Sequence, residues 1–382
     1  MDPISADTIT SDIYAGPFHE RQKAAGGTFY EDMGGLWTQA FSDPVGEYWA
    51  VRRGTAIWDV SSLVKFRLTG TDALAALDRL TTRRLSGADP GVIRYGMILD
   101  ERGRMLDEGT SLAVSPTEAY FFGNDERERF VEHLNSHTRD LEVTIENVTT
   151  RIPNIAVQGP GSYALLSALS DTDFAGLGWF RFIPQPVRIA GVPGLLSRTG
   201  FTGELGYEFF LLDEGEGAGR LWDAIVEAGA APIGLDAIEM LRVEAGLVIQ
   251  EEDYFPGETD PYDLSLDSFI DIDGHAFVGR EAAAETATAP PRRFKTLVFE
   301  GDGVPEQAEP VTKDGVVVGD VRSAERTPRY GVIALAVLQS RSARKGDTVE
   351  VGERTATVKG LPIDDPKKER PRSDPRNPKK AG

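Results

Sequence analysis

The sequence predicts an α+β fold with antiparallel hairpins, followed by a small all-β domain near the C-terminus. Three observations support this. Strand-like and helix-like segments mix up to about residue 280 without regular strand–helix–strand repetition. Pro290 and Pro291 mark a linker, and only short strand-like segments follow them. The last residues, 363–382, are rich in Lys, Arg and Pro, which predicts a disordered basic tail.

Apolar periodicity places the individual elements before the linker. Alternation predicts strands, and apolar residues repeated near every 3.6 positions predict helices. The expected strands lie at 65–69, 97–99, 105–114, 120–122, 154–157, 187–189, 194–197 and 207–212. The expected helices lie at 47–56, 73–80, 126–134, 162–169, 219–228 and 235–245. Segments 97–99 and 105–114 flank the charged turn 100–103 and predict a hairpin.

Beyond the linker, only short strands are expected. They lie at 295–299, 316–318, 331–337, 348–351 and 355–358, and they predict a small barrel or sandwich.

Composition excludes several classes of function. The 382 residues hold 61 Asp+Glu against 41 Lys+Arg, for a net charge of −20, which argues against nucleic-acid and anionic-membrane partners. Without cysteine there is no disulfide framework, zinc–thiolate site or thiol nucleophile. The first 26 residues lack a signal-peptide pattern, and no apolar run approaches the ~18 residues of a membrane span. A cytoplasmic location is therefore expected.

The first candidate for chemistry is the acidic pair Asp107 and Glu108 on the return strand of the hairpin. Neighbouring strand residues point to opposite faces, so one carboxylate should face the interior and the other solvent. An inward carboxylate is costly unless it has a partner or a function. From the residues alone, a solvated pair near a turn is the favoured interpretation.

The second candidate is the segment 198–208, which holds Gly200, Gly203 and Gly206. Its spacing does not match a phosphate-binding loop. Either it is a tight loop between strands, or it is a turn that lines a ligand site. In the second case Glu208 would accept two N–H donors from a planar heterocycle.

Other polar motifs favour structural interpretations. Arg242 on the helix 235–245 can pair with Glu239 or be buried against another element. The acidic run 251–253 could bind a metal or an amine cation, but a solvated surface is more common. His133 and His137 are spaced i,i+4, yet the four histidines show no convincing metal-site spacing, so no metal is predicted.

Taken in order, these motifs resemble the aminomethyltransferase (T-protein) family of the glycine cleavage system and its folate-dependent demethylase relatives. The matching stretches are 57–61, 102–108, 155–160, 198–208, 241–246 and 277–280. The resemblance, from about residue 45 to 360, implies a three-domain ring around a cavity that holds tetrahydrofolate. It implies a folate-binding region 1–285, made of interleaved subdomains at roughly 1–60 with 150–285 and at 61–149, and a barrel at 290–362.

The resemblance also implies roles for individual residues. The catalytic carboxylate falls on Glu108, with Asp107 beside it, and the pterin-binding glutamate falls on Glu208. The expected cofactor-binding residues are Leu63, Phe122, Asn124, Tyr207, Glu208 and Arg242.

The sequence departs from the glycine-cleavage pattern at Leu205, Ile238, Gln250 and Glu251, and by having Glu at 108 in place of Asp. We therefore expect a tetrahydrofolate-dependent demethylase or methyltransferase that takes a methyl group from a small O-, N- or S-methyl donor. One alternative is an aminomethyltransferase, which would need a lipoyl carrier protein as its partner. A second alternative is a non-catalytic folate-binding protein.

Overall fold

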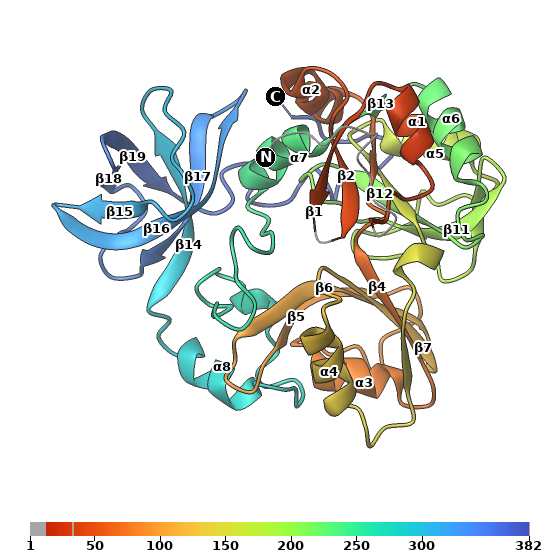
Figure 1. Cartoon of the computed structure of the whole chain (residues 1–382), viewed down its shortest axis with the longest axis horizontal. Helices are drawn as coiled ribbons and strands as arrows, with labels where there is room; N and C mark the ends of the chain where they lie inside the picture. The colour runs from red at the N-terminus through yellow and green to blue at the C-terminus, as the bar shows by residue number, and fades with distance from the viewer. Residues whose placement is uncertain (1–12, 33, 382) are drawn as a thin grey trace.

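The computed structural model describes residues 13–32 and 34–381, which form three bodies arranged as a ring (Figure 1). One body is built on a six-stranded sheet, the second on a five-stranded sheet, and the third is a closed β-barrel. A cavity of about 1320 Å³ is lined by residues from all three. The predicted fold class, two α+β regions with a C-terminal all-β barrel, is confirmed.

The six-stranded body brings distant parts of the chain into one sheet, in the order β10-β11-β12-β9-β3-β13. Its strands are β3 (Ala56–Asp59), β9 (Asn154–Gln158), β10 (Val187–Ile189), β11 (Val192–Ser197), β12 (Gly206–Leu211) and β13 (Ala231–Pro232). The early strand β3 pairs antiparallel with β9 and parallel with β13. This sheet is therefore completed only after the chain has passed through the five-stranded body.

Helices and one hairpin complete the six-stranded body. They are α1 (His19–Ala24), α2 (Pro44–Arg53), α5 (Ser162–Leu169), α6 (Ala218–Glu227) and α7 (Leu235–Ala245), with β1 (Thr28–Asp32) and β2 (Gly35–Ala40). The expected helix 47–56 begins earlier and ends earlier than predicted. Asp43 caps its start by accepting the Gly46 N–H, while Ala56 already pairs with Gln158 in the sheet. The tertiary pairing of Ala56 ends the helix.

The five-stranded body has the strand order β5-β6-β7-β4-β8. Its elements are β4 (Val64–Thr69), α3 (Ala73–Leu80), β5 (Ile93–Leu99), β6 (Met105–Ser115), β7 (Glu118–Gly123), α4 (Glu128–Ser136) and β8 (Thr144–Asn147), followed by the 3₁₀ turn Thr149–Arg151. The predicted β5–β6 hairpin is present. Asp100 shapes its turn by accepting the N–H groups of Arg102 and Arg104, and Gly103 adopts the left-handed φ of 74° that the turn requires.

A connecting segment, residues 246–279, leads to α8 (Arg280–Ala287) and the barrel. It contains a 3₁₀ turn at Asp267–Phe269. The barrel strands are β14 (Arg292–Phe299), β15 (Pro310–Lys313), β16 (Val316–Thr327), β17 (Gly331–Gln339), β18 (Thr348–Val351) and β19 (Arg354–Lys359). Tyr254, Tyr262 and Leu264 of the connecting segment share one apolar core with residues of the β5–β6 hairpin and of the barrel. This core joins the two bodies.

The C-terminal segment differs from the expected disordered tail, because Asp364, Arg370 and Ser373 are buried against the body. Arg370 pairs with Glu204 at 2.9 Å and with Asp364, and Arg198 donates to the carbonyl oxygens of Pro371 and Ser373. Glu204, one of the two buried acids that pair with Arg370, lies far away in the sequence, so the local sequence does not reveal this contact.

Among residues 13–32 and 34–381, no helix is both long and apolar enough to cross a membrane. The positions at which one domain ends and the next begins stay a prediction.

Candidate active site

Two sheets meet at the cavity through aromatic contact. Phe122 of β7 and Phe210 of β12 pack with their ring centroids 4.6 Å apart. Phe122 is paired across the sheet with Lys65 of β4 and with Thr110 of β6, so the wall continues from the six-stranded sheet to the five-stranded sheet. Glu108 lies on the wall formed by the five-stranded sheet, and Glu208 lies on the wall formed by the six-stranded sheet.

Glu108 lies on the wall formed by the five-stranded body. Its side chain lines the cavity and is 9% exposed. Asn124 donates from Nδ2 to Glu108 Oε1 at 3.2 Å and to the Glu108 carbonyl oxygen at 3.1 Å. The Tyr95 hydroxyl also hydrogen-bonds to the carboxyl group of Glu108. The structure therefore fixes this carboxyl group while leaving it open to the cavity.

Asp107 lies behind Glu108 and is completely buried. It accepts backbone N–H groups from Glu108 at 2.8 Å, from Asn124 at 2.9 Å and from Asp125 at 3.2 Å. The Tyr254 hydroxyl donates to it at 3.2 Å. A Cβ at Gly123 would lie 2.4 Å from Asp107 Oδ2, so only glycine leaves room for this carboxylate. Asp107 thus anchors the chain that positions Asn124.

Proximity makes the two carboxyl groups titrate differently. Burial and then the charge of Asp107 raise the pKa of Glu108 to about 7. Burial also raises the pKa of Asp107 to about 6, against the opposing effect of its N–H donors. Because Asp107 holds more of the hydrogen bonds that favour the charged form, Glu108 is the member of the pair that takes up a proton near neutral pH.

The expected solvent-facing carboxylate is not found, because neither Asp107 nor Glu108 faces bulk solvent. Strand alternation places one of two neighbouring side chains in solvent only if one face of the hairpin is exposed to solvent. Here Met97 and Met105 of the hairpin are covered by Tyr254 and Tyr262 of the connecting segment. That cover comes from about 150 residues later in the chain, so local periodicity does not reveal it.

Glu208 lies on the wall formed by the six-stranded body and also lines the cavity. It accepts a short hydrogen bond from the Thr199 hydroxyl. Burial raises the pKa of Glu208, while the Thr199 hydrogen bond and the charge of Lys65 oppose the rise. Lys65 is itself buried, with Nζ 2.7 Å from the Leu63 carbonyl oxygen, and burial lowers its pKa to about 7.

Asn154 supplies the clearest sign of a ligand. It lines the cavity and lies opposite Phe210 in the β9–β12 pairing, while Glu208 lies opposite Ala156, so the two polar groups share one face of the sheet. Its Oδ1 and Nδ2 are buried without a hydrogen-bond partner in the described part of the chain. Buried polar atoms are rarely left unpaired in folded proteins. Together with the Glu208 carboxylate they offer donors and acceptors suited to a polar planar heterocycle.

The cavity lining is rich in charge. Acidic side chains outnumber basic ones in it, and among them are Asp236, Glu239, Glu252 and Glu325. Arg94 belongs to a basic part of the lining, where burial and the nearby charges of Arg83 and Arg181 lower its pKa. From the C-terminal segment, Arg372 lies over the ring of Trp179 at 4.4 Å, and both residues line the cavity.

The structure brings most of the predicted site residues together. Leu63, Phe122, Asn124, Glu108 and Glu208 all line the cavity. Sequence reasoning missed Lys65, Asn154 and Tyr254. The local sequence gives little signal for them, because Lys65 alternates with apolar residues just as Arg67 does in the same strand.

Tyr207 and Arg242 do not line the cavity. The Tyr207 side chain points into the core on the opposite face of β12 from Glu208, with its ring 5.3 Å from that of Phe174. Arg242 is fully buried and pairs with Glu239, Glu252 and Asp253, each at 2.6 Å. Their positions favour structural roles.

The sequence and the fold of this chain are similar to those of known proteins. Residues 18–274 match the family described as the GCVT N-terminal domain, and residues 292–366 match the glycine cleavage T-protein C-terminal barrel domain. The chain belongs to the glycine cleavage T-protein family. A crystal structure of glycine cleavage system aminomethyltransferase T from Bartonella henselae superposes with a TM-score of 0.82 at 21% identity, covering 92% of this chain and 98% of that one. It shows the same fold.

Individual family members carry different names. A probable aminomethyltransferase of Halobacterium salinarum is 34% identical, over 88% of this chain and 93% of its own length. An aminomethyltransferase of Herpetosiphon aurantiacus is 30% identical, over 92% and 97%. A trimethylamine-oxide aldolase of Ruegeria pomeroyi is 33% identical over 93% of this chain, which spans 48% of that protein. Membership of the family therefore leaves the reaction to be argued from the site.

Proposed function

We propose that this T-protein family member is a tetrahydrofolate-dependent one-carbon transferase that takes a methyl group from a small methylated donor. The observation that carries the proposal is the cavity with Glu208 and the unpartnered Asn154 amide on one wall and Glu108 on the other. The first wall suits the polar edge of a pterin, and the second holds a carboxyl group whose pKa lies near neutral pH.

Glu208 and Asn154 would hold the pterin ring. An ionised carboxylate accepts two parallel N–H donors of a planar heterocycle, and the amide can both donate and accept beside it. The aromatic pair Phe122 and Phe210 supplies an apolar surface next to these groups. Tetrahydrofolate, when bound, supplies the nitrogen that accepts the one-carbon unit.

Glu108 would act as the proton acceptor. In its ionised form it accepts a proton at its carboxylate, while Asn124 keeps hold of Oε1 and Asp107 keeps Asn124 in place. The negative charge of the pair would also stabilise the positive charge of a cationic donor and of the nitrogen that takes up its methyl group. Asp107 acts through Asn124 and through its own charge, because it does not line the cavity.

The lining favours a donor that carries positive charge. The acidic residues Asp236 and Glu325 face the cavity together with the aromatic rings of Trp37 and Trp58, whose centroids lie 6.2 Å apart. Aromatic faces and carboxylates together attract alkylated cations. An N- or S-methyl donor suits this environment better than a neutral O-methyl donor.

The second candidate function is aminomethyl transfer from a lipoyl carrier protein. The aminomethyltransferase names of the Halobacterium salinarum and Herpetosiphon aurantiacus relatives favour it. The two functions share the folate site and differ in what delivers the carbon.

One experiment separates the candidates. The full chain is incubated with tetrahydrofolate and a panel of O-, N- and S-methyl donors, and methylated folate is measured by mass spectrometry. A parallel reaction supplies an aminomethyl-lipoyl carrier protein and measures methylene-tetrahydrofolate. Product from a methyl donor supports the proposal, product only from the carrier supports the second candidate, and folate binding without product in either reaction would overturn both.

A further inference from the structure

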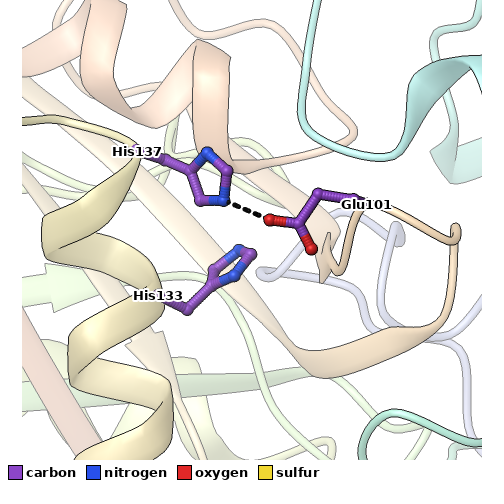
Figure 2. A group of neighbouring side chains, drawn as sticks. All are labelled: Glu101, His133 and His137. Carbon is purple, nitrogen blue, oxygen red and sulfur yellow. Dashed lines mark hydrogen bonds and ion pairs between the residues drawn. The ribbon is translucent and has the colours of Figure 1, made fainter.

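Three side chains of metal-binding type meet at one edge of the five-stranded body. His133 lies on α4, His137 caps the C-terminal end of that helix one turn later, and Glu101 lies in the turn between β5 and β6 (Figure 2). One ligand atom of each lies within 4.8 Å of the others. None of the three lines the central cavity.

His137 and Glu101 contact each other, but His133 finds no polar partner among the described residues. His137 Nε2 lies 2.9 Å from Glu101 Oε1, and the two imidazole rings have their centroids 4.5 Å apart. The Nε2 atom of His133 is buried and has no hydrogen-bond partner among the described residues. A buried ring nitrogen without a partner lowers stability, so this site gains from any group that can coordinate it.

We propose that Glu101, His133 and His137 bind a divalent transition-metal ion, with Zn²⁺ as the first choice. Two imidazoles and one carboxylate form a ligand set that Zn²⁺ accepts, with a fourth position left for water. Histidines at i and i+4 on one helix face are a spacing that places both rings on the same ion.

The geometry needs a small closure to reach a tetrahedral site. Bonds of about 2.0–2.1 Å place neighbouring ligand atoms about 3.3 Å apart. The Glu101 side chain is 69% exposed and comes from a turn, so it is free to move toward the rings. The two histidines are already held side by side by α4, and Arg79 fixes the end of that helix by donating to the His137 carbonyl oxygen at 3.0 Å.

The ion would join α4 to the turn that begins β6. That strand carries Asp107 and Glu108. The metal would therefore stabilise the position of β6 without contacting the cavity. The sequence showed the two histidines but not the third ligand, which comes from a turn more than thirty residues earlier.

The test uses the untagged full chain after treatment with a chelator. Zn²⁺ alone is titrated by calorimetry, and Co²⁺ is titrated by visible absorption to report the coordination geometry. We expect one ion per chain and a higher Tm in its presence. His133→Ala and His137→Ala should each weaken Zn²⁺ binding by roughly tenfold or more.

Matched variants keep the proposal falsifiable. Glu132→Gln removes an exposed charge from the same helix, and His275→Ala removes a histidine outside the group, and both should bind Zn²⁺ like the parent chain. If the histidine variants fail to fold, Glu101→Gln in the exposed turn should still weaken binding. Absence of Zn²⁺ binding by the parent chain would overturn the proposal, and so would unchanged affinity in Glu101→Gln or in the His133→Ala/His137→Ala double variant.

Discussion

Two glutamates line the same cavity in opposite surroundings. Glu108 has the like charge of Asp107 beside it, whereas Glu208 has the Thr199 hydroxyl and the Lys65 ammonium. Burial raises the pKa of both, but Asp107 adds to the rise at Glu108 while the neighbours of Glu208 oppose it. The surroundings therefore differ in charge, because a second carboxylate lies beside Glu108 whereas a hydroxyl donor and a lysine lie beside Glu208.

The largest effect is expected from Glu108→Gln, which keeps the shape of the side chain and removes its proton chemistry. Turnover should fall by roughly 10²–10⁴-fold, the usual contribution of a general acid or base. Initial rates under saturating folate and donor measure this change. Folate affinity should stay within a few-fold of the parent, and parent-like turnover would show that Glu108 is a lining residue only.

Glu208→Gln should act on binding instead. Loss of the charged acceptor should weaken tetrahydrofolate affinity by roughly 10- to 100-fold, because hydrogen bonds to charged groups contribute about 1.5–3 kcal/mol. Quenching of tryptophan fluorescence reports the affinity, since Trp58 and Trp179 line the cavity. Glu227→Gln, an exposed position on α6, is the matched control. Equal affinity in both variants would remove Glu208 from the folate site.

A third buried carboxyl group, Asp364, extends the comparison to a site rich in cations. Burial opposes its ionisation, but the hydrogen bond of Arg370 and the charges of Arg52 and Arg329 lower the pKa of Asp364 to about 2. Because the native pKa lies below the unfolded value of 3.8, ionised Asp364 contributes stability above pH 4, and this is lost as pH falls toward 2.

Asp364→Asn should therefore lower the free energy of unfolding by about 2 kcal/mol at pH 7. Urea unfolding of the full chain measures the change, with the exposed Asp89→Asn as control. The deficit should shrink between pH 4 and pH 2. A deficit that stays constant over that range would mean that the ion pairs of Asp364 are not its cause.

The smallest effect is a shift in the pH profile of turnover. Because burial and Asp107 raise the pKa of Glu108 to about 7, the ionised form that accepts a proton becomes common only above that pH. The rate should rise with pH through about 7. Asp107→Asn removes the like charge, so the midpoint should move to lower pH, which rate measurements from pH 5 to 9 would detect. An unchanged midpoint would show that the charge of Asp107 does not set the pKa that controls the rate.

Sequence patterns predicted what depends on near neighbours. The β5–β6 hairpin with Glu108, the strand that carries Glu208 and the short strands after Pro291 follow from alternation, turn residues and composition. The family resemblance, rather than the patterns, indicated which of the acids belong to one cavity.

What the sequence could not predict depends on partners far along the chain. Tyr254 donates to Asp107 across 147 positions, and Arg52 pairs with Glu204 and Glu244 across 152 and 192 positions. The basic composition of the C-terminal segment indicated disorder because its buried partners, among them Glu204, lie elsewhere in the sequence. Arg242, which the resemblance places among the cofactor-binding residues, instead hydrogen-bonds to Asp253 and Ser323, which belong to the connecting segment and the barrel.

Calorimetric titration of tetrahydrofolate into the full chain, its Glu208→Gln variant and its Glu108→Gln variant tests the division of labour between the two walls most directly. We predict one folate per chain, with affinity reduced by Glu208→Gln and nearly unchanged by Glu108→Gln. Failure of the parent chain to bind folate, or an equal loss of affinity in both variants, would contradict it.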